Sequence, residues 1–472
     1  MSVLLLEPFV DEKTKWGSFQ VEGGYIPPLG MIALYSYLKH KGIPVKFIDT
    51  QFGDYTKDDI RNLLLNNRGI DIIGIPVFTN SAYYSFRTAQ FCKEVRPDVT
   101  IVLGGVHATS LPQRTLEECP SADYIVMGEG EITFFELITK INNKETLNNV
   151  CGIAYRSEGR IICNPPREHI KNLDELPRTY YDDIDLSRYV PHPTQYKALP
   201  NFPIVTQRGC PYQCTFCEAS LIHGKKVRRY SVPRVLDELD ILVHKFGAKG
   251  IYFQDSTFTI DRKYVTELLE KMIKRKFNLL WACNTRVDRV DRELLHLMKR
   301  AGCWMISYGI ESANQQSLDI LKKGITVEQT LKSVALTKKA GISILGSFIL
   351  ALPGEDEKMV QNTIAFAKKL LPDIALFYLP MPYPGSELYQ IGKKTHEIRE
   401  GAQWKDYIAV DFNNPVYVNN LLKSEKMRYY YKKAYHDYYS NPRYLTKMLF
   451  TIRSLNDVRR YWRGLRAVSN AF

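Results

Sequence analysis

Three closely spaced cysteines carry the clearest chemical signal in the chain. Cys210, Cys214 and Cys217 form a C-x3-C-x2-C pattern. Three thiolates this close in sequence can hold three corners of a cuboidal iron–sulfur cluster and leave one iron without a protein ligand. A structural zinc ion needs four ligands, and His223, the next potential ligand, follows Cys217 by six residues. The spacing therefore favours an iron–sulfur cluster with an open, reactive iron over zinc.

With the aromatic Phe216 before its last cysteine, this motif resembles that of the radical S-adenosylmethionine (SAM) superfamily. In that family a 4Fe-4S cluster binds the amino and carboxylate groups of SAM, and reductive cleavage gives a 5′-deoxyadenosyl radical. The resemblance implies that Phe216 lies beside SAM and that Asp255 contacts the methionine amino group. It also implies that Arg286 and Glu311 contact the carboxylate or the ribose. A salt bridge or a helix cap is the alternative role for each of the last three residues.

Six apolar segments alternate with helix-like stretches around these residues. They span 204–206, 250–253, 279–282, 304–308, 344–350 and 374–378. Such alternation predicts a parallel sheet, and six units predict a partial (β/α)6 barrel of the TIM type over residues 201–400. Polar residues and glycines follow each segment. They would gather at the C-terminal mouth of the barrel, where the active sites of such folds lie.

The first 150 residues show a second alternating series. Its strands are expected at 3–6, 45–48, 72–77, 101–103 and 124–127, which predicts an α/β, Rossmann-like (flavodoxin-like) parallel sheet. Ligands of such sheets bind beyond the carboxyl ends of the strands. The residues expected there are Thr79, Asn80, Gly104, Gly105, His107, Thr109, Gly128, Glu129 and Gly130.

Together with the segment 27–30 (Pro-Pro-Leu-Gly), this glycine-rich edge resembles the cobalamin-binding domain that precedes the barrel in the largest subgroup of the superfamily. The resemblance implies that the nine edge residues bind cobalamin. A flavodoxin-like or dinucleotide-binding domain is the alternative, although no G-x-G-x-x-G follows the first strand. Classical cobalamin modules supply an axial histidine from D-x-H-x-x-G, but no histidine precedes His40. We therefore expect base-off cobalamin without an axial histidine, and we expect His107 to contact the corrin or to pack in the core.

The remaining segments are less informative. Residues 151–163 predict a β-hairpin, residues 151–200 a connector, and residues 401–472 a helical, tyrosine-rich region. From residue 421 onward the chain has 12 Lys or Arg and 3 Asp or Glu. Basic residues among aromatic ones suit an anionic membrane surface. Solvated charges on a helical cap of the barrel are the alternative, and nucleic acid is disfavoured because no binding motif is present.

Composition indicates the class of protein and its cellular compartment. The 472 residues have a formal net charge of +13, and 45% are hydrophobic, which is typical of a globular protein. No secretion signal precedes the first strand and no apolar run is long enough to span a bilayer. Nine cysteines, six of them scattered, indicate a reducing compartment. We therefore expect a cytoplasmic enzyme, with peripheral membrane contact through residues 421–472 as the alternative.

The leading functional hypothesis is a cobalamin-dependent radical methylase that acts on an unactivated carbon. The second hypothesis is a radical oxidative cyclase similar to anaerobic magnesium-protoporphyrin monomethyl ester cyclases, and the third is a non-catalytic cobalamin sensor. Methylthiotransferases, a sister family, need three further N-terminal cysteines, and the spacing of Cys92, Cys119 and Cys151 is poor for a cluster. A small or lipid-like substrate and an electron donor such as flavodoxin or ferredoxin complete the prediction.

Overall fold

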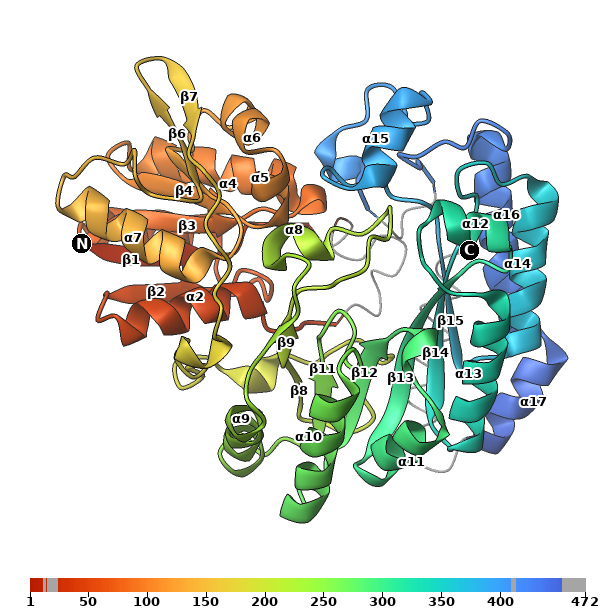
Figure 1. The fold of residues 1–472 in the computed structure, drawn as a ribbon. Helices are drawn as coiled ribbons and strands as arrows, with labels where there is room; N and C mark the ends of the chain where they lie inside the picture. Colours follow the sequence, from red (N-terminus) through yellow and green to blue (C-terminus); the bar gives the residue numbers. More distant parts are fainter. Residues whose placement is uncertain (12–13, 15–23, 409–412, 452–472) are drawn as a thin grey trace.

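Two sheets, one in each half of the chain, organise the protein (Figure 1). The structure is a computed structural model, and it describes residues 1–11, 14, 24–408 and 413–451. The N-terminal sheet has the strand order β2-β1-β3-β4-β5-β6-β7, and the second sheet has the order β15-β14-β13-β12-β11-β8. Both consist mainly of parallel strands with helices between them, so the predicted α/β class is confirmed.

The N-terminal sheet has the flavodoxin-like order 2-1-3-4-5 in its parallel part, which confirms the Rossmann-like prediction. Its strands are β1 (Ser2–Leu6), β2 (Val45–Ile48), β3 (Ile70–Pro76), β4 (Thr100–Gly104) and β5 (Tyr124–Val126). Its helices are α2 (Leu29–His40), α3 (Lys57–Asn66), α4 (Ala82–Val95), α5 (Val106–Ser110), α6 (Pro112–Glu118) and α7 (Gly130–Asn142). Leu4, Leu5 and Leu6 are fully buried, as expected for a strand covered on both faces.

The predicted hairpin extends this sheet. Strands β6 (Ile153–Ser157) and β7 (Arg160–Cys163) pair antiparallel, and β6 pairs antiparallel with β5. The connector that follows contains the short 3-10 turns η3 (Leu173–Glu175) and η4 (Leu186–Arg188). The chain thus leaves the first sheet at its hairpin edge and crosses to the second sheet.

The second sheet is an open, six-stranded parallel barrel, which confirms the predicted partial barrel. Its strands are β8 (Asn201–Ile204), β11 (Gly250–Phe253), β12 (Leu280–Thr285), β13 (Cys303–Glu311), β14 (Ser343–Ile349) and β15 (Ile374–Tyr378). The outer helices are α9 (Val232–His244), α10 (Arg262–Arg275), α11 (Arg292–Arg300), α12 (Gln315–Ile320), α13 (Val327–Lys339) and α14 (Glu357–Leu370). The main hydrophobic core lies between these strands and helices.

A two-stranded ribbon stands apart from the barrel strands. It pairs β9 (Gln207–Arg208) with β10 (Arg228–Arg229) in antiparallel orientation. The cysteine motif and the short helix α8 (Ala219–His223) lie between these two strands. The ribbon therefore anchors both ends of the cysteine loop.

The C-terminal region is helical where the structure describes it. It contains α15 (Glu387–Lys394), the 3-10 turn η6 (Trp404–Asp406), α16 (Lys423–Tyr439) and α17 (Pro442–Thr451). Figure 1 shows α16 beside α14 and β15, at the open edge of the barrel. Residues 452–472 of the basic region that begins at residue 421 lie outside the described residues. Among the described helices, none has the length and apolar character to cross a bilayer.

Candidate active site

The cysteine loop lies at the end of the first barrel strand, between β9 and β10. The backbone N–H of Cys210 donates to the carbonyl of Gly224 at 3.1 Å, and that of Cys217 donates to the carbonyl of Cys214 at 3.1 Å. Burial, together with the charges of Cys214 and Cys210, raises the pKa of the Cys217 thiol to about 11. The three thiols are thus within electrostatic reach of one another. In the described part of the chain, no three His, Cys, Asp or Glu side chains are grouped as ligands of a single ion.

Asp255 supports the segment that leads into this loop. Its carboxylate accepts hydrogen bonds from the backbone N–H groups of Thr206 at 2.8 Å and Gln207 at 3.0 Å, and from the Thr206 hydroxyl at 2.6 Å. Burial raises the pKa of Asp255 to about 6, although these hydrogen bonds lower it. The carboxylate therefore fixes the backbone just before Arg208, and its predicted contact with SAM stays a prediction.

Arg286 lies against the cysteine loop. Its guanidinium carbon is 3.6 Å from the ring centroid of Tyr212, and its Nε donates to Asp288 at 2.8 Å. Its Nη1 is buried and has no hydrogen-bond partner among the described residues. Because a buried, unpaired guanidinium N–H is costly, this atom fits an anionic ligand beside the loop, such as a carboxylate.

Glu311 forms a buried ion pair with Lys323, a residue that the sequence analysis did not identify. The Lys323 Nζ lies 2.7 Å from Glu311 Oε1 and 5.7 Å from the ring centroid of Phe216. A Cβ at Gly309 would stand 2.3 Å from the same carboxylate oxygen, so only glycine leaves room for the pair. The pair brings Glu311 and Phe216 to one place beside the cysteine loop. Lys323 could not be found from the sequence because it lies twelve residues beyond its partner, in a loop.

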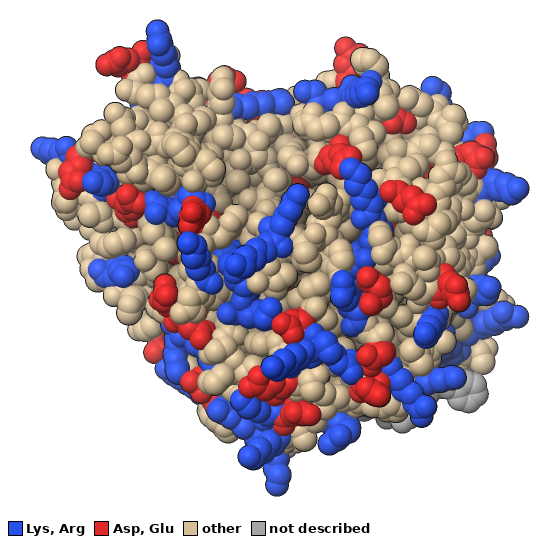
Figure 2. All heavy atoms as spheres, viewed as in Figure 1, with Lys and Arg blue, Asp and Glu red and all other residues tan. Residues whose placement is uncertain are grey.

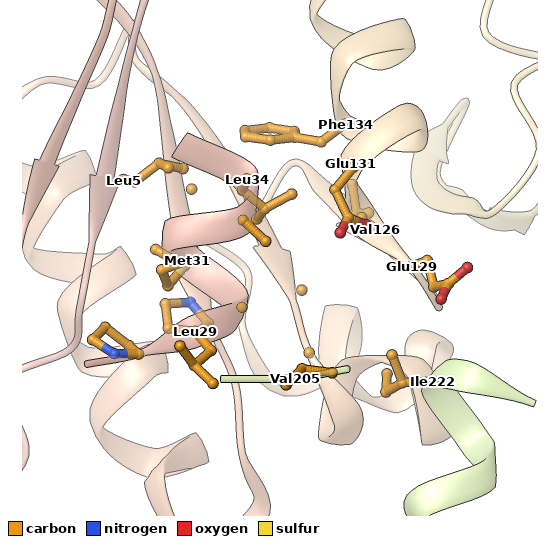
Figure 3. A pocket seen from close by; sticks show the side chains of 18 of the residues that line it. Leu5, Leu29, Met31, Leu34, Val126, Glu129, Glu131, Phe134, Val205 and Ile222 are labelled. Atoms are coloured by element: carbon orange, nitrogen blue, oxygen red, sulfur yellow. The ribbon is translucent and has the colours of Figure 1, made fainter. Parts of the chain in front are cut away.

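A cavity of about 420 Å³ joins the N-terminal sheet to the barrel. Apolar side chains of β1, α2 and α7 line one end, and Figure 3 shows Leu5, Leu34 and Phe134 gathered there. Residues on either side of the cysteine loop, Arg208 and Ile222, line it from the barrel side. The cavity therefore connects the carboxyl edge of the first sheet with the flank of the cysteine motif.

Glycines make this cavity possible. Gly104, Gly105, Gly128 and Gly130 all line it. Gly105 has a φ of +100°, and a Cβ there would lie 2.9 Å from the carbonyl oxygen of Val77. This backbone conformation is essentially restricted to glycine. The absence of side chains along this edge leaves space for a large, flat ligand such as a corrin, so the residues present fit cobalamin.

Four of the residues predicted for cobalamin do not line the cavity. They are Thr79, Asn80, His107 and Thr109. Thr109 accepts a hydrogen bond from the N–H of Gly128 at 3.0 Å, which holds the glycine turn. His107 is fully buried. Burial lowers the pKa of His107 to about 4. Its ring packs on that of Trp404 at a centroid distance of 4.7 Å.

Glu129 lines the cavity, but its carboxylate points to the barrel. Glu129 Oε1 lies 2.8 Å from Arg228 Nη2, 3.3 Å from Arg208 Nη1 and 3.1 Å from the Nδ1 of His223. Burial favours a higher pKa for Glu129, but hydrogen bonds from His223 and Arg228 and the charge of Arg208 hold it well below its usual range. Arg208 also donates to Glu131 at 2.5 Å. This buried network links the cavity edge of the first sheet to both strands that anchor the cysteine loop.

Two family models match the chain, in the order that the fold indicates. The B12 binding domain matches residues 20–138, and the radical SAM superfamily matches residues 204–367. The first match contains the glycine edge of the cavity. The second contains the cysteine loop, Arg286 and Glu311. The cofactors of the protein are therefore a 4Fe-4S cluster, SAM and cobalamin.

Similar proteins cover nearly the whole chain. An uncharacterized methyltransferase of Pyrococcus horikoshii is 34% identical over 99% of this chain and 98% of its own length. The anaerobic magnesium-protoporphyrin IX monomethyl ester cyclase of Rubrivivax gelatinosus is 32% identical over 88% of this chain and 73% of its own length. Both similarities extend across the two domains and the connector.

A solved structure shares the fold. The cobalamin-dependent S-adenosylmethionine radical enzyme OxsB, with aqua-cobalamin and SAM bound, has a TM-score of 0.75, 21% identity, and coverage of 100% of this chain and 72% of that chain. Its resemblance supports the relative placement of the two domains. The cysteine loop, the glycine-lined cavity and the full-length similarity agree, and the chain belongs to the radical SAM enzymes that carry a B12-binding domain.

Proposed function

We propose that the protein methylates an unactivated carbon of a small molecule in a cobalamin-dependent radical reaction. The observation that carries this proposal is the continuous cavity that reaches from the glycine edge of the first sheet to Arg208 and Ile222 beside the cysteine loop. Such a cavity would hold cobalamin next to the SAM site. The similarity to a methyltransferase over nearly the full length of both chains supports the same function.

Each part of the site has a proposed role. Cys210, Cys214 and Cys217 would hold the 4Fe-4S cluster, and the unpaired Nη1 of Arg286 would bind the carboxylate of SAM. The Glu311–Lys323 pair would face the methionine amino group or the ribose, with Phe216 beside it. When bound, the cluster supplies the electron that cleaves SAM to a 5′-deoxyadenosyl radical, and cobalamin supplies the methyl group that the substrate carbon receives.

The protein would contribute position and shielding rather than a base. An unactivated C–H bond has no acidic proton, so a titratable side chain cannot start the reaction. The chain instead holds the two cofactor sites at a fixed separation through the Glu129 network and lines the cavity between them mainly with apolar residues. Enclosure of this kind protects a radical from water and side reactions.

A direct test uses the reconstituted enzyme. The protein would be loaded anaerobically with iron, sulfide and cobalamin, and SAM products would be measured by mass spectrometry with dithionite as reductant. S-adenosylhomocysteine together with 5′-deoxyadenosine supports methylation. The variant Cys214→Ala should lose the 4Fe-4S absorbance and both products, whereas Cys163→Ser, at an exposed cysteine outside the site, should retain them. No SAM cleavage by the reconstituted protein would refute the proposal.

Radical oxidative cyclisation is the second candidate, and the similarity to magnesium-protoporphyrin IX monomethyl ester cyclases supports it. Both reactions would use the same cavity and the same cysteines. The two candidates differ in the fate of SAM. In the experiment above, 5′-deoxyadenosine without S-adenosylhomocysteine would favour cyclisation over methylation.

Cobalamin would bind base-off and without an axial histidine. His107 packs on Trp404 and does not line the cavity, and the only imidazole among the described lining residues is His223, whose Nδ1 lies 3.1 Å from Glu129. The electron paramagnetic resonance spectrum of bound Co(II) cobalamin should therefore lack nitrogen hyperfine splitting, and His223→Ala should leave it unchanged. Nitrogen splitting that disappears in His223→Ala would contradict this proposal.

The proposed partners follow from the reaction. A small or lipid-like substrate in the cytoplasm and an electron donor of the flavodoxin or ferredoxin class fit it. Membrane contact through residues 421–472 has less support, because Tyr430, Tyr431, Tyr435 and Tyr438 of α16 are buried against the barrel. Vesicle flotation of the full chain with anionic lipids would test that contact.

A further inference from the structure

An exposed basic surface lies at the junction of the two domains. Figure 2 shows Lys and Arg side chains gathered in the middle of the drawn face, near the place of α8 and β9 in Figure 1. The segment that joins α8 to β10 contains Lys225 and Lys226, both exposed. Neither ammonium group has a salt-bridge partner within the described residues, so both positive charges are available to a partner.

Neighbouring charges leave this surface positive. Lys171 is paired with Glu168 at 3.1 Å, and Arg229 is paired with Asp261 at 2.8 Å. These two pairs are locally neutral. The surplus charge of the surface therefore comes from Lys225 and Lys226, which we call the lysine pair.

The lysine pair lies directly on the cysteine loop. The carbonyl of Gly224 accepts the backbone N–H of Cys210 at 3.1 Å. A Cβ on Gly209, whose φ is +95°, would stand only 2.2 Å from the carbonyl oxygen of Lys226. The backbones of the two segments thus touch, and one layer of peptide separates the surface that carries the lysine pair from the first cluster ligand.

We propose that this surface is the docking site of a small acidic one-electron carrier protein that reduces the cluster. This proposal rests on the proposed function, which requires one electron for each SAM cleaved. Electron tunnelling weakens exponentially with distance, so a carrier must dock close to the cluster. The hydrogen bond from Cys210 to Gly224 gives a short path through that layer. In the transfer the carrier's redox centre is oxidised by one electron and the cluster is reduced by one electron, with no proton required.

The lysine pair would mainly raise the rate at which the carrier associates with the enzyme. Complementary charges raise association rates by ten- to about a thousandfold at low salt, and the effect falls as salt increases. A carrier with an acidic face would be drawn to the lysine pair, whereas a small inorganic reductant would need no docking surface. A comparison of the rates with the two kinds of reductant therefore distinguishes an effect on docking from an effect on the cluster.

The test compares the double variant Lys225→Glu/Lys226→Glu with a matched control on the outer face of the barrel, Lys332→Glu/Lys339→Glu. The control residues are exposed on α13, and the control changes the net charge equally. Cluster reduction in the reconstituted full chain would be followed by stopped-flow absorbance with a reduced flavodoxin or with dithionite. Binding of oxidised flavodoxin would be measured by calorimetry.

We expect the lysine-pair variant to lower the second-order rate with flavodoxin at least about tenfold at low salt, to weaken flavodoxin binding, and to leave the dithionite rate unchanged. The control variant should match the unmodified protein in all three. Equal flavodoxin rates in both variants would overturn the docking site while leaving the proposed function intact. Slower cluster reduction with dithionite as well would also overturn it, because the lysine pair would then support the cysteine loop itself. Failure of dithionite to reduce the cluster of the unmodified protein would instead refute the proposed function.

Discussion

The hydroxyl of Tyr435 bonds to both backbone groups of Phe377. It accepts the Phe377 N–H at 3.2 Å and donates to the Phe377 carbonyl at 3.1 Å. One helical turn along α16, Tyr439 makes the same pair of bonds with Ala375, at 3.2 and 2.9 Å. Strand β15 is the last strand of the open barrel, so these groups would otherwise be an unpaired edge. Tyrosine hydroxyls suit this position because each can donate and accept.

Removal of one such hydroxyl should destabilise the barrel edge. Tyr435→Phe keeps the ring but leaves a buried N–H and a carbonyl of β15 without partners, which costs about 2 kcal/mol. Urea denaturation of the full chain would measure the loss. Tyr429→Phe, at a residue that is 59% exposed on the same helix, should change stability by less than about 0.5 kcal/mol. Equal effects of the two variants would contradict the edge-capping role.

The Glu129 network should stabilise the domain interface at neutral pH. Glu129→Gln keeps the shape of the side chain but leaves Arg208 and Arg228 less well paired, and breaking a buried ion pair costs about 3–5 kcal/mol. The folded pKa of Glu129 lies below the unfolded value of about 4.3. Its contribution is therefore fully present above that value and is lost as the pH falls through the folded pKa.

This pH dependence gives a measurement with a defined sign. The difference in unfolding free energy between the unmodified protein and Glu129→Gln should be constant from pH 7 to pH 5, and it should shrink only below about pH 4.3. Denaturation series at four pH values would follow it. A difference that vanishes above pH 5 would show that the carboxylate is not held ionised by Arg208 and Arg228.

Arg286 should set the affinity for SAM without affecting the cluster. Arg286→Lys removes the planar guanidinium that stacks on Tyr212 and the unpaired Nη1, and lysine does not replace such geometry. A charge-assisted hydrogen bond contributes about 1.5–3 kcal/mol, so the Kd for SAM should rise about 10- to 100-fold. Equilibrium dialysis on the reconstituted protein would measure it. Arg289→Lys, at the more exposed neighbouring arginine, is the control, and an equal loss in both would argue against a specific contact.

Gly105 should be required for cobalamin binding. Gly105→Ala places a Cβ 2.9 Å from the Val77 carbonyl oxygen in a backbone conformation that only glycine adopts readily. The turn at the cavity edge must then shift, and cobalamin absorbance titrations should show weaker binding. Gly159→Ala is a matched control, because Gly159 also has a positive φ, at +75°, but a Cβ placed there would meet no atom within 4 Å. Unchanged cobalamin affinity in Gly105→Ala would exclude this edge as the binding site.

The sequence predicts the elements of the fold well because their strands are apolar and buried. Alternation of short apolar runs with helices identified both parallel sheets. Strand ends were less accurate. The prediction ended the fourth barrel strand at Tyr308, whereas β13 continues to Glu311. Glu311 stays in the strand although it is charged, because it still pairs with Phe348 of β14 and its carboxylate is neutralised by Lys323.

The first barrel strand shows a different limit. The prediction placed it at 204–206, but β8 covers Asn201–Ile204. The backbone N–H of Thr206 bonds to the Asp255 carboxylate instead of a neighbouring strand. A carboxylate 49 residues away thus decides where the strand ends. The local pattern of apolar residues along the chain contains no information on such a contact.

The site itself was predictable only where the chemistry lies in one segment. The three cysteines have a fixed spacing and needed no fold. Lys323 and Arg228 became visible only through the structure, because their partners Glu311 and Glu129 lie far from them along the chain or across a loop. Glu129 was expected to face cobalamin because of its position after a glycine, but its direction depends on arginines from the other domain.

The contact between Trp404 and His107 attaches the C-terminal region to the first domain. The chain leaves the first domain through the connector, builds the barrel, and returns to the first domain at η6. Two domains joined at one place can rotate relative to each other, whereas a second attachment restricts that rotation. The spacing of the two domains is therefore held at two places, by the Glu129 network and by this aromatic contact. Lengthening the segment 395–403 by a few residues would loosen the second attachment and leave every residue of the cavity wall unchanged.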